Sequence, residues 1–322
     1  MLSQDTLPLP GRGRPHGRGG SALQMPSVTG SNSPSNTVLG LLQRVLTGRA
    51  APSALNTPQM PASRLVRTSV GVRSVVVAGE GGPTVVFESG LGQGKEAWAP
   101  VFKAIAGHAR ALAYDRAGYG DSEAAPGARD GEQAVQELCA LLMALELPPP
   151  YVLVGHSLGG TLMKLFARLY PHEVAGVVLV DARNSDFSKR ARHMGVRRML
   201  YEPPKALYWL ARSATRRELR ALPQTMQQAR RAGPFPSVPL IVLTHSRAAT
   251  HWPRNLGRAW LNSQHSMARM SVLGRISVCD DAGHQLHRDR PDAVVHAVLS
   301  VLEAARYLQA KQRVSVQHPL PR

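Results

Sequence analysis

One serine in this chain has the surroundings that a nucleophile requires. Ser157 is the central residue of Gly155-His-Ser-Leu-Gly159, and Gly160 follows it. The preceding run Tyr151-Val-Leu-Val154 has the composition of a buried strand, and a helical stretch continues to Leu169. A strand that turns directly into a helix must reverse sharply, and the two glycines leave room for that turn. The serine oxygen would then project above a sheet, beside a helix N-terminus that favours developing negative charge.

A serine hydroxyl is a poor nucleophile near neutral pH unless a neighbouring base takes its proton. The best candidate base is His284, in the short loop Asp280-Asp-Ala-Gly-His284 after the last predicted strand. His287 is its close rival, three residues further on. His156 is interpreted as a packing residue, because adjacent side chains in so tight a turn point apart. The other histidines are placed on the surface or in a lid: His245, His251 and His265.

The elements that must position these residues follow from the hydrophobic pattern. Apolar, β-branched runs alternate with helical patterns, as in a mostly parallel sheet whose strands are joined by crossover helices. Strands are predicted at 74–77, 84–87, 109–114, 151–154, 174–180, 240–244 and 275–279. Helices are predicted at 133–145 and 292–308, and a helix pair around 194–222.

Three segments, in this order, resemble the α/β-hydrolase superfamily. The first, Asp115-Arg-Ala-Gly-Tyr-Gly-Asp-Ser122, is similar to the Asp-Arg-x-Gly-x-Gly-x-Ser loop of many members. The second is the turn around Ser157, and the third is Ala282-Gly-His284 after the last strand. The resemblance covers residues 70–308 and identifies no single subfamily. It implies an α/β fold with a mostly parallel, doubly wound sheet of about eight strands and a helical cap inserted at about 182–236.

The resemblance leaves the acid of a catalytic triad open. Many members place it after the strand that corresponds to 240–244, but no Asp or Glu occurs here from residue 240 to 279. An acid that orients the imidazole must then come from another loop at the same edge of the sheet. Asp181, at a position that some members use instead, is favoured, and Asp186 is the alternative. Three further options stay open: Asp280, Asp281, or no acid.

An oxyanion hole needs two backbone N–H groups that are fixed where negative charge develops. Leu158, directly after the nucleophile, is expected to supply the first. Leu91 is expected to supply the second, from the loop Ser89-Gly-Leu-Gly-Gln-Gly94. This loop resembles the His-Gly-x loop of the family, with Ser89 in the place of the histidine. No Gly-Lys-Ser/Thr follows it, so its glycines do not indicate a phosphate site.

The N-terminal part of the chain has a different composition. Residues 1–64 are rich in Gly, Pro, Ser and Arg and show no sustained apolar period, which predicts a disordered tail before an α/β-hydrolase domain at 65–322. The tail is also Arg-rich and acid-poor, as an organellar transit segment is. A cytoplasmic location is the first expectation and an organelle the alternative. No apolar run reaches the roughly 18 residues that a membrane span needs, so a soluble protein is expected.

Basic residues are concentrated in the insertion. The formal net charge is +18, and residues 182–236 contribute +10 of it. With an apolar group nearby, these arginines would suit a lid that lies on an anionic membrane, but a solvated basic face on a helix pair is the favoured explanation. That apolar group consists of Tyr201, Leu207, Tyr208, Trp209 and Leu210. No aromatic residue interleaves with the Gly-Arg stretch at 11–20, so specific nucleic-acid binding is not expected.

The leading hypothesis is a carboxylesterase- or lipase-like serine hydrolase that cleaves a small acyl substrate through an acyl-enzyme on Ser157. No cofactor is expected, and the two cysteines lack metal-ligand spacing. A serine nucleophile argues against epoxide hydrolases and haloalkane dehalogenases, which need a carboxylate. Thioesters, amides and C–C bonds remain open, because the same machinery cleaves them. The alternatives are an inactive binding protein with this fold, suggested by the missing acid after 244, or a basic protein that associates with membranes or nucleic acid.

Overall fold

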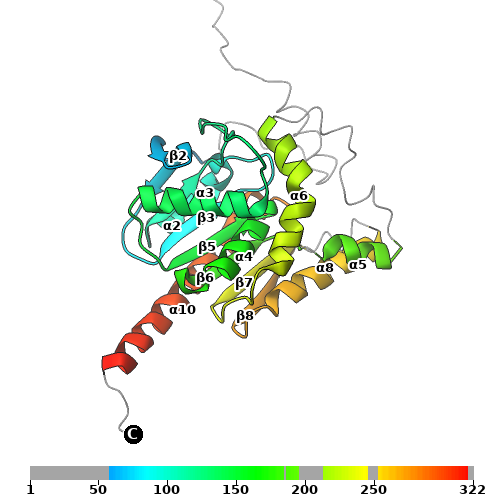
Figure 1. Cartoon of the computed structure of the whole chain (residues 1–322). Coiled ribbons are helices and arrows are strands. Elements are labelled where there is room, and N and C mark those ends of the chain that lie inside the picture. Colours follow the sequence, from blue (N-terminus) through cyan, green and yellow to red (C-terminus); the bar gives the residue numbers. More distant parts are fainter. Residues whose placement is uncertain (1–57, 185, 196–212, 246–252, 318–322) are drawn as a thin grey trace, which may run out of the picture. The chain divides into compact units, whose positions relative to one another are not determined.

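Eight strands form one sheet in the order β1-β2-β4-β3-β5-β6-β7-β8 (Figure 1). The computed structural model describes residues 58–184, 186–195, 213–245 and 253–317. β1 pairs antiparallel with β2 and β2 with β4, while all other pairs are parallel. The strands are β1 (Arg64–Thr68), β2 (Gly71–Ala78), β3 (Thr84–Glu88), β4 (Ala111–Tyr114), β5 (Tyr151–His156), β6 (Val174–Val180), β7 (Leu240–His245) and β8 (Gly274–Cys279).

The central strands are apolar on both faces because helices cover both sides of the sheet. Every residue of β3, β5 and β6 is buried. Successive side chains of a strand point to opposite faces. Accordingly, Val85 and Phe87 belong to one apolar cluster and Val86 to the other. The predicted doubly wound, mostly parallel α/β sheet is confirmed.

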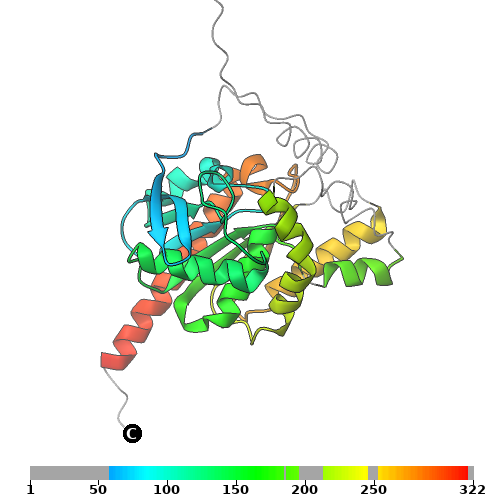
Figure 2. The same ribbon diagram turned by 45° about the horizontal axis from the view of Figure 1, so that its top comes forward.

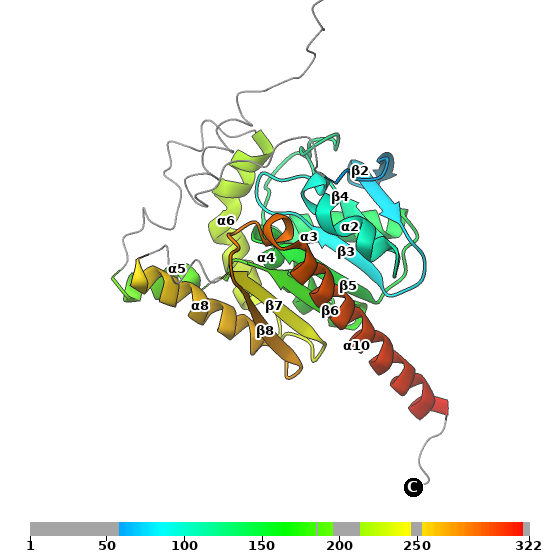
Figure 3. The same cartoon turned by 180° about the vertical axis from the view of Figure 1, so that it is seen from behind.

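Three helices pack on one face of the sheet, α3 (Gly131–Ala144), α4 (Leu158–Leu169) and α8 (Arg254–Ala268), and α6 (Ser213–Arg231) packs on α3 and α4. The other face, seen in Figure 3, carries α2 (Ala99–Ala106), α9 (Leu286–Asp289) and α10 (Pro291–Gln317). Three short segments complete the described part: η2 (Lys95–Trp98), η3 (Pro171–Glu173) and α5 (Phe187–His193). No helix within the described residues has the length and apolarity that crossing a membrane requires.

The seven predicted strands are all present, and β1 is an addition to them. Only Val66 of β1 is buried, so an edge strand with arginines at 64 and 67 gave no alternating apolar pattern. In the insertion, α5 packs on α8 through Phe187 and Trp260, and α6 packs on α3 and α4 (Figure 2). α6 begins at Ser213 and continues past the predicted end at 222. The predicted tail up to residue 57 and the apolar group at 201–210 lie outside the described residues.

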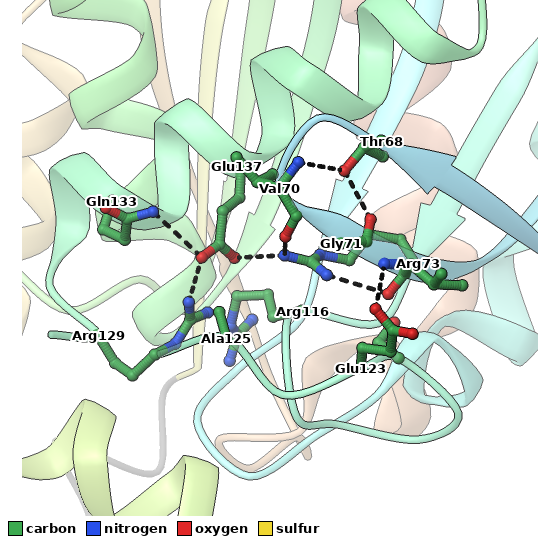
Figure 4. Close-up of polar contacts among 12 residues, drawn as sticks. Thr68, Val70, Gly71, Arg73, Arg116, Glu123, Ala125, Arg129, Gln133 and Glu137 are labelled. Atoms are coloured by element: carbon green, nitrogen blue, oxygen red, sulfur yellow. Dashed lines mark hydrogen bonds and ion pairs between the residues drawn. The ribbon is translucent and has the colours of Figure 1, made fainter. Parts of the chain in front are cut away.

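A buried ion cluster ties the first hairpin to α3 (Figure 4). The Glu137 carboxylate lies 3.3 Å from Arg73 Nη2 through Oε2 and accepts a hydrogen bond from Arg129 through Oε1. All three side chains are 4% exposed or less. Arg73 also donates to the carbonyls of Val70 and Val72, at 3.0 Å each. Removing the carboxylate would therefore leave two arginines in the interior without their counter-charge.

Replacing Glu137 by alanine should lower the free energy of unfolding by about 3–5 kcal/mol, the usual cost of removing one partner of a buried pair. Urea unfolding followed by circular dichroism measures this loss. Glu132→Ala is the matched control, because Glu132 is exposed on the same helix. Equal losses in the two variants would mean that the cluster does not stabilise the fold.

Candidate active site

Ser157 stands at the turn between β5 and α4 in an uncommon backbone conformation. Its φ is 53° and its ψ is −113°. Such a conformation costs a non-glycine residue about 1–3 kcal/mol and persists only where its surroundings hold it. Here the Ser157 N–H donates to Val180 O and its carbonyl accepts from Arg183 N, both at 3.1 Å. The turn is thus anchored to the chain segment that leaves β6.

Glycine at 159 allows α4 to start directly against the end of β3. A Cβ on Gly159 would lie 2.3 Å from Glu88 O and 2.7 Å from Ser89 O. Both neighbours are main-chain atoms, which cannot move aside as a flexible side chain can. The close approach brings the segment after Ser157 into contact with the segment that leads into the loop 89–94.

The structure brings Ser157, His284 and Asp181 together. His284 Nε2 lies 3.0 Å from Ser157 Oγ, and His284 Nδ1 lies 2.6 Å from Asp181 Oδ2. The three residues follow β5, β8 and β6, whose carboxyl ends meet at one edge of the sheet. The Asp181 side chain is fully buried, whereas that of His284 is 30% exposed. Solvent therefore reaches the imidazole but not the carboxylate.

The Asp181 carboxylate has further polar contacts that hold it in place. Oδ1 accepts from Thr244 Oγ1 at 2.9 Å and from Trp260 Nε1 at 3.3 Å. His245 Nε2 lies 3.4 Å from Oδ2. Placing His245 on the surface or in a lid was wrong, because its side chain is 4% exposed and lies at the end of β7. A buried carboxylate needs such partners, since an unsatisfied charge in the interior is costly.

Thr244 and Trp260 were missed from the sequence. Thr244 had a signal that could have found it, because it is a polar residue directly after the apolar run Leu240–Leu243 of β7. Trp260 had none, because one tryptophan in a helical stretch usually indicates packing. His265 is exposed, as expected, and His251 lies outside the described residues.

His287, the rival of His284, and the neighbouring His156 are both buried beside the site. His156 Nε2 lies 2.8 Å from the His284 carbonyl oxygen, and burial, with the neighbouring His287 and His284, holds the pKa of His156 well below 6.5. The neutral ring carries one N–H, and its Nδ1 lies 3.0 Å from Gln93 Oε1, so the tautomer decides which of the two oxygens accepts from His156. The His287 ring lies 4.4 Å from that of His156 and 5.1 Å from Trp98, and burial lowers its pKa to about 3. Both rings stay neutral near pH 7 and pack around the loop that carries His284.

The alternative acids lie elsewhere. Within the described residues, Asp186 makes no hydrogen bond or ion pair with His284; it precedes α5, and its carbonyl accepts from Arg190 N at 2.9 Å. Asp280 and Asp281 are exposed. A further carboxylate, that of Asp289, accepts from Gly283 N at 2.7 Å and so holds the loop before His284.

The two residues expected to form an oxyanion hole belong to adjoining segments. Leu158 is the first residue of α4, and the first amides of a helix have no acceptor within it. Leu91 lies in a turn that Gln93 N closes onto Gly90 O at 3.2 Å. The φ of +76° at Gly92 suits the third position of a type II turn, which needs glycine. Donation to an oxyanion by these two amides stays a prediction.

Replacing Gly159 by alanine should lower the free energy of unfolding by about 1–3 kcal/mol, because the new methyl group overlaps main-chain oxygens. Helix propensity alone predicts the opposite sign, a gain of up to about 1 kcal/mol. Chemical denaturation distinguishes the two outcomes. Gly233→Ala is the control, since a Cβ there meets only Arg168 O at 3.7 Å and should change little. A stabilised Gly159→Ala protein would contradict the close contact.

Comparison with known proteins agrees with this architecture. A family model described as alpha/beta hydrolase fold matches residues 83–266. The uncharacterized protein YqjL of Bacillus subtilis is 30% identical over 233 residues, 70% of this chain and 86% of that protein. The 2-hydroxy-6-oxo-2,4-heptadienoate hydrolase of Pseudomonas putida is 39% identical over 113 residues, 34% of this chain and 40% of that protein.

Among solved structures, an esterase from Thermogutta terrifontis has the same fold. Its TM-score is 0.55 at 21% identity, and the match covers 76% of this chain and 99% of that chain. The curated relatives support a hydrolase. With the family model matching more than half of the chain, this protein belongs to the α/β-hydrolase family.

Proposed function

We propose that this protein is a serine hydrolase that cleaves a carboxylic ester through an acyl-enzyme on Ser157. The observation that carries the proposal is the continuous chain of hydrogen bonds from Ser157 Oγ to His284 and on to Asp181, at 3.0 and 2.6 Å. A nucleophile, a base and an acid that orients the base are the parts that acyl transfer by serine requires.

In the proposed reaction, Ser157 Oγ attacks the ester carbonyl carbon while His284 Nε2 takes the hydroxyl proton. The N–H groups of Leu158 and Leu91 stabilise the oxyanion of the tetrahedral intermediate. The intermediate collapses, and the departing alcohol takes the proton from His284. Water, deprotonated by His284, then attacks the acyl-enzyme carbonyl. The second tetrahedral intermediate collapses, Ser157 Oγ leaves and takes the proton back from His284, and the acid is released. These steps use only residues of this chain.

Asp181 suits the role of the orienting acid. Thr244 and Trp260 occupy its Oδ1, so Oδ2 is directed to His284. An ionised carboxylate at Nδ1 fixes the tautomer that leaves Nε2 free to accept the serine proton, and it stabilises the imidazolium that forms. The His284 carbonyl oxygen lies 2.8 Å from His156 Nε2, so the main chain of His284 is contacted separately from its side chain.

The alternative of an inactive binding protein was suggested by the absence of an acid after β7. The 2.6 Å contact between Asp181 and His284 favours the catalytic proposal, because β6 supplies the carboxylate instead. The proposed partner is a small acyl substrate. Contact with an anionic membrane depends on the apolar group at 201–210, which lies outside the described residues, so no observation favours it.

A fluorophosphonate probe should add one adduct to the wild-type protein and none to Ser157→Ala, because only an activated serine reacts with it. Intact mass spectrometry measures the adduct. Ser277→Ala is the control, since Ser277 is exposed on β8 and should not affect labelling. Folded wild-type protein that stays unlabelled would argue for a binding role.

Substitution by asparagine distinguishes the two candidate acids, Asp181 and Asp186. Asp181→Asn keeps the shape of the side chain but loses its charge, so kcat on short p-nitrophenyl esters should fall roughly 10³- to 10⁴-fold. Asp186→Asn should change kcat less than about threefold, because this residue lies outside the hydrogen-bonded chain. If the larger loss belonged to Asp186→Asn, the assignment of the acid would be wrong.

A further inference from the structure

A buried arginine holds the main chain at the start of the loop 89–94. Arg116, in the motif after β4, donates from Nη1 to Ser89 O at 2.7 Å and from Nη2 to Gly90 O at 3.0 Å. Nη1 also lies 2.6 Å from Glu88 Oε1. One guanidinium therefore contacts three successive residues at the end of β3. The planar group with several fixed donors suits this task better than lysine would.

The same guanidinium is held by a glutamate of the insertion helix α6. Glu218 accepts from Arg116 Nε at 2.7 Å through Oε1 and from Nη2 at 3.0 Å through Oε2. Tyr119 donates its hydroxyl to Glu218 Oε2 at 2.7 Å. The hydroxyl oxygen of Tyr119 accepts from Gly92 N at 3.2 Å. Glu218 thus reaches the loop by two routes.

These contacts lie on both sides of Leu91. Arg116 holds the carbonyls of residues 89 and 90, and Tyr119 holds the amide of residue 92. The position and direction of the Leu91 N–H are set by the peptide units around it. A small rotation of the turn would move this donor away from the developing oxyanion, where a displacement of about 1 Å can cost 100-fold in rate.

The network is shielded from water and strongly charged. The side chains of Arg116, Glu88 and Glu218 are 4% exposed or less. Burial alone would lower the pKa of Arg116, but the carboxylates of Glu218 and Glu88 raise it well above the usual value for arginine. Charge-assisted hydrogen bonds in such surroundings are strong and geometrically specific. The carboxylate of Glu218 is the part of this network that α6 contributes.

We propose that Glu218 is a positioning residue that, through Arg116 and Tyr119, fixes the loop 89–94 and with it the Leu91 N–H. The proposal rests on the serine-hydrolase function proposed above. It couples the placement of the insertion helix α6 to transition-state stabilisation. Glu218 acts only through the two side chains between it and the loop.

Two conservative variants test the coupling. Glu218→Gln keeps the shape but removes the charge, and Tyr119→Phe removes only the hydroxyl that joins Glu218 to Gly92. Both should lower kcat for ester hydrolysis and the affinity for a boronic-acid inhibitor about 10- to 100-fold, since only the tetrahedral states use the oxyanion donors. KM should stay within about threefold. Hydrogen exchange of the peptide 88–95 should become faster in both variants, whether or not the protein has esterase activity.

Gln224→Ala is the matched control on α6. Gln224 donates to Asp130 Oδ2 at 2.8 Å and holds α6 against the start of α3, away from the loop. The Gln224→Ala substitution should lower the melting temperature without changing kcat or the hydrogen exchange of the peptide 88–95. The proposal is overturned if Glu218→Gln and Tyr119→Phe leave the exchange of 88–95 unchanged, or if they alter kcat no more than Gln224→Ala does. Absence of fluorophosphonate labelling in the wild type would instead refute the proposed function, and the exchange result would still decide whether Glu218 holds the loop.

Discussion

The close approach of α4 to the end of β3 is the constraint on which the site depends. A glycine at 159 lets the helix begin where any side chain would meet Glu88 O. The approach places the nucleophile turn against the loop 89–94, so the two expected oxyanion donors come from adjoining segments. At the same turn Ser157 has a positive φ, where the chain passes directly from β5 into α4. The strained Ser157 and the closely packed Gly159 therefore belong to one turn.

Two buried polar clusters support this arrangement in different ways. Asp181 is one carboxylate surrounded by neutral or weakly basic donors, so its charge is held by hydrogen bonds and by the imidazole that it orients. Arg116 is one cation between two carboxylates, so its placement is governed by charge as well as geometry. The first cluster lies at the ends of β6 and β7. The second joins the end of β3 to α6, which lies within the insertion.

Much of the fold could be predicted, because the buried strands are continuous apolar runs whose length and flanking turns are visible in the chain. β1 was missed because this edge strand buries only Val66, so its sequence shows no alternation of apolar and polar residues. α6 continued beyond its predicted end because packing on α3 and α4 supports the polar helix around Pro223. For the site, the nucleophile and base were proposed from local patterns. The histidine at 245 was misplaced because its burial depends on a neighbouring strand.

The strand, the turn and the helix around Ser157 could be predicted from the amino-acid sequence alone, as could the order of the loops that carry Leu91, Asp181 and His284. These features depend on steric rules between near neighbours, which a short stretch of residues contains. Which carboxylate contacts His284 depends on the folded arrangement, since Asp181 lies 103 residues earlier in the chain and is brought there because β6 lies between β5 and β7. The pairing of Arg116 with Glu218, across 102 residues, was decided in the same way. Hydrogen bonds between residues so far apart in the sequence depend on the order of the strands in the sheet and on the packing of helices against it. No local sequence pattern contains that order.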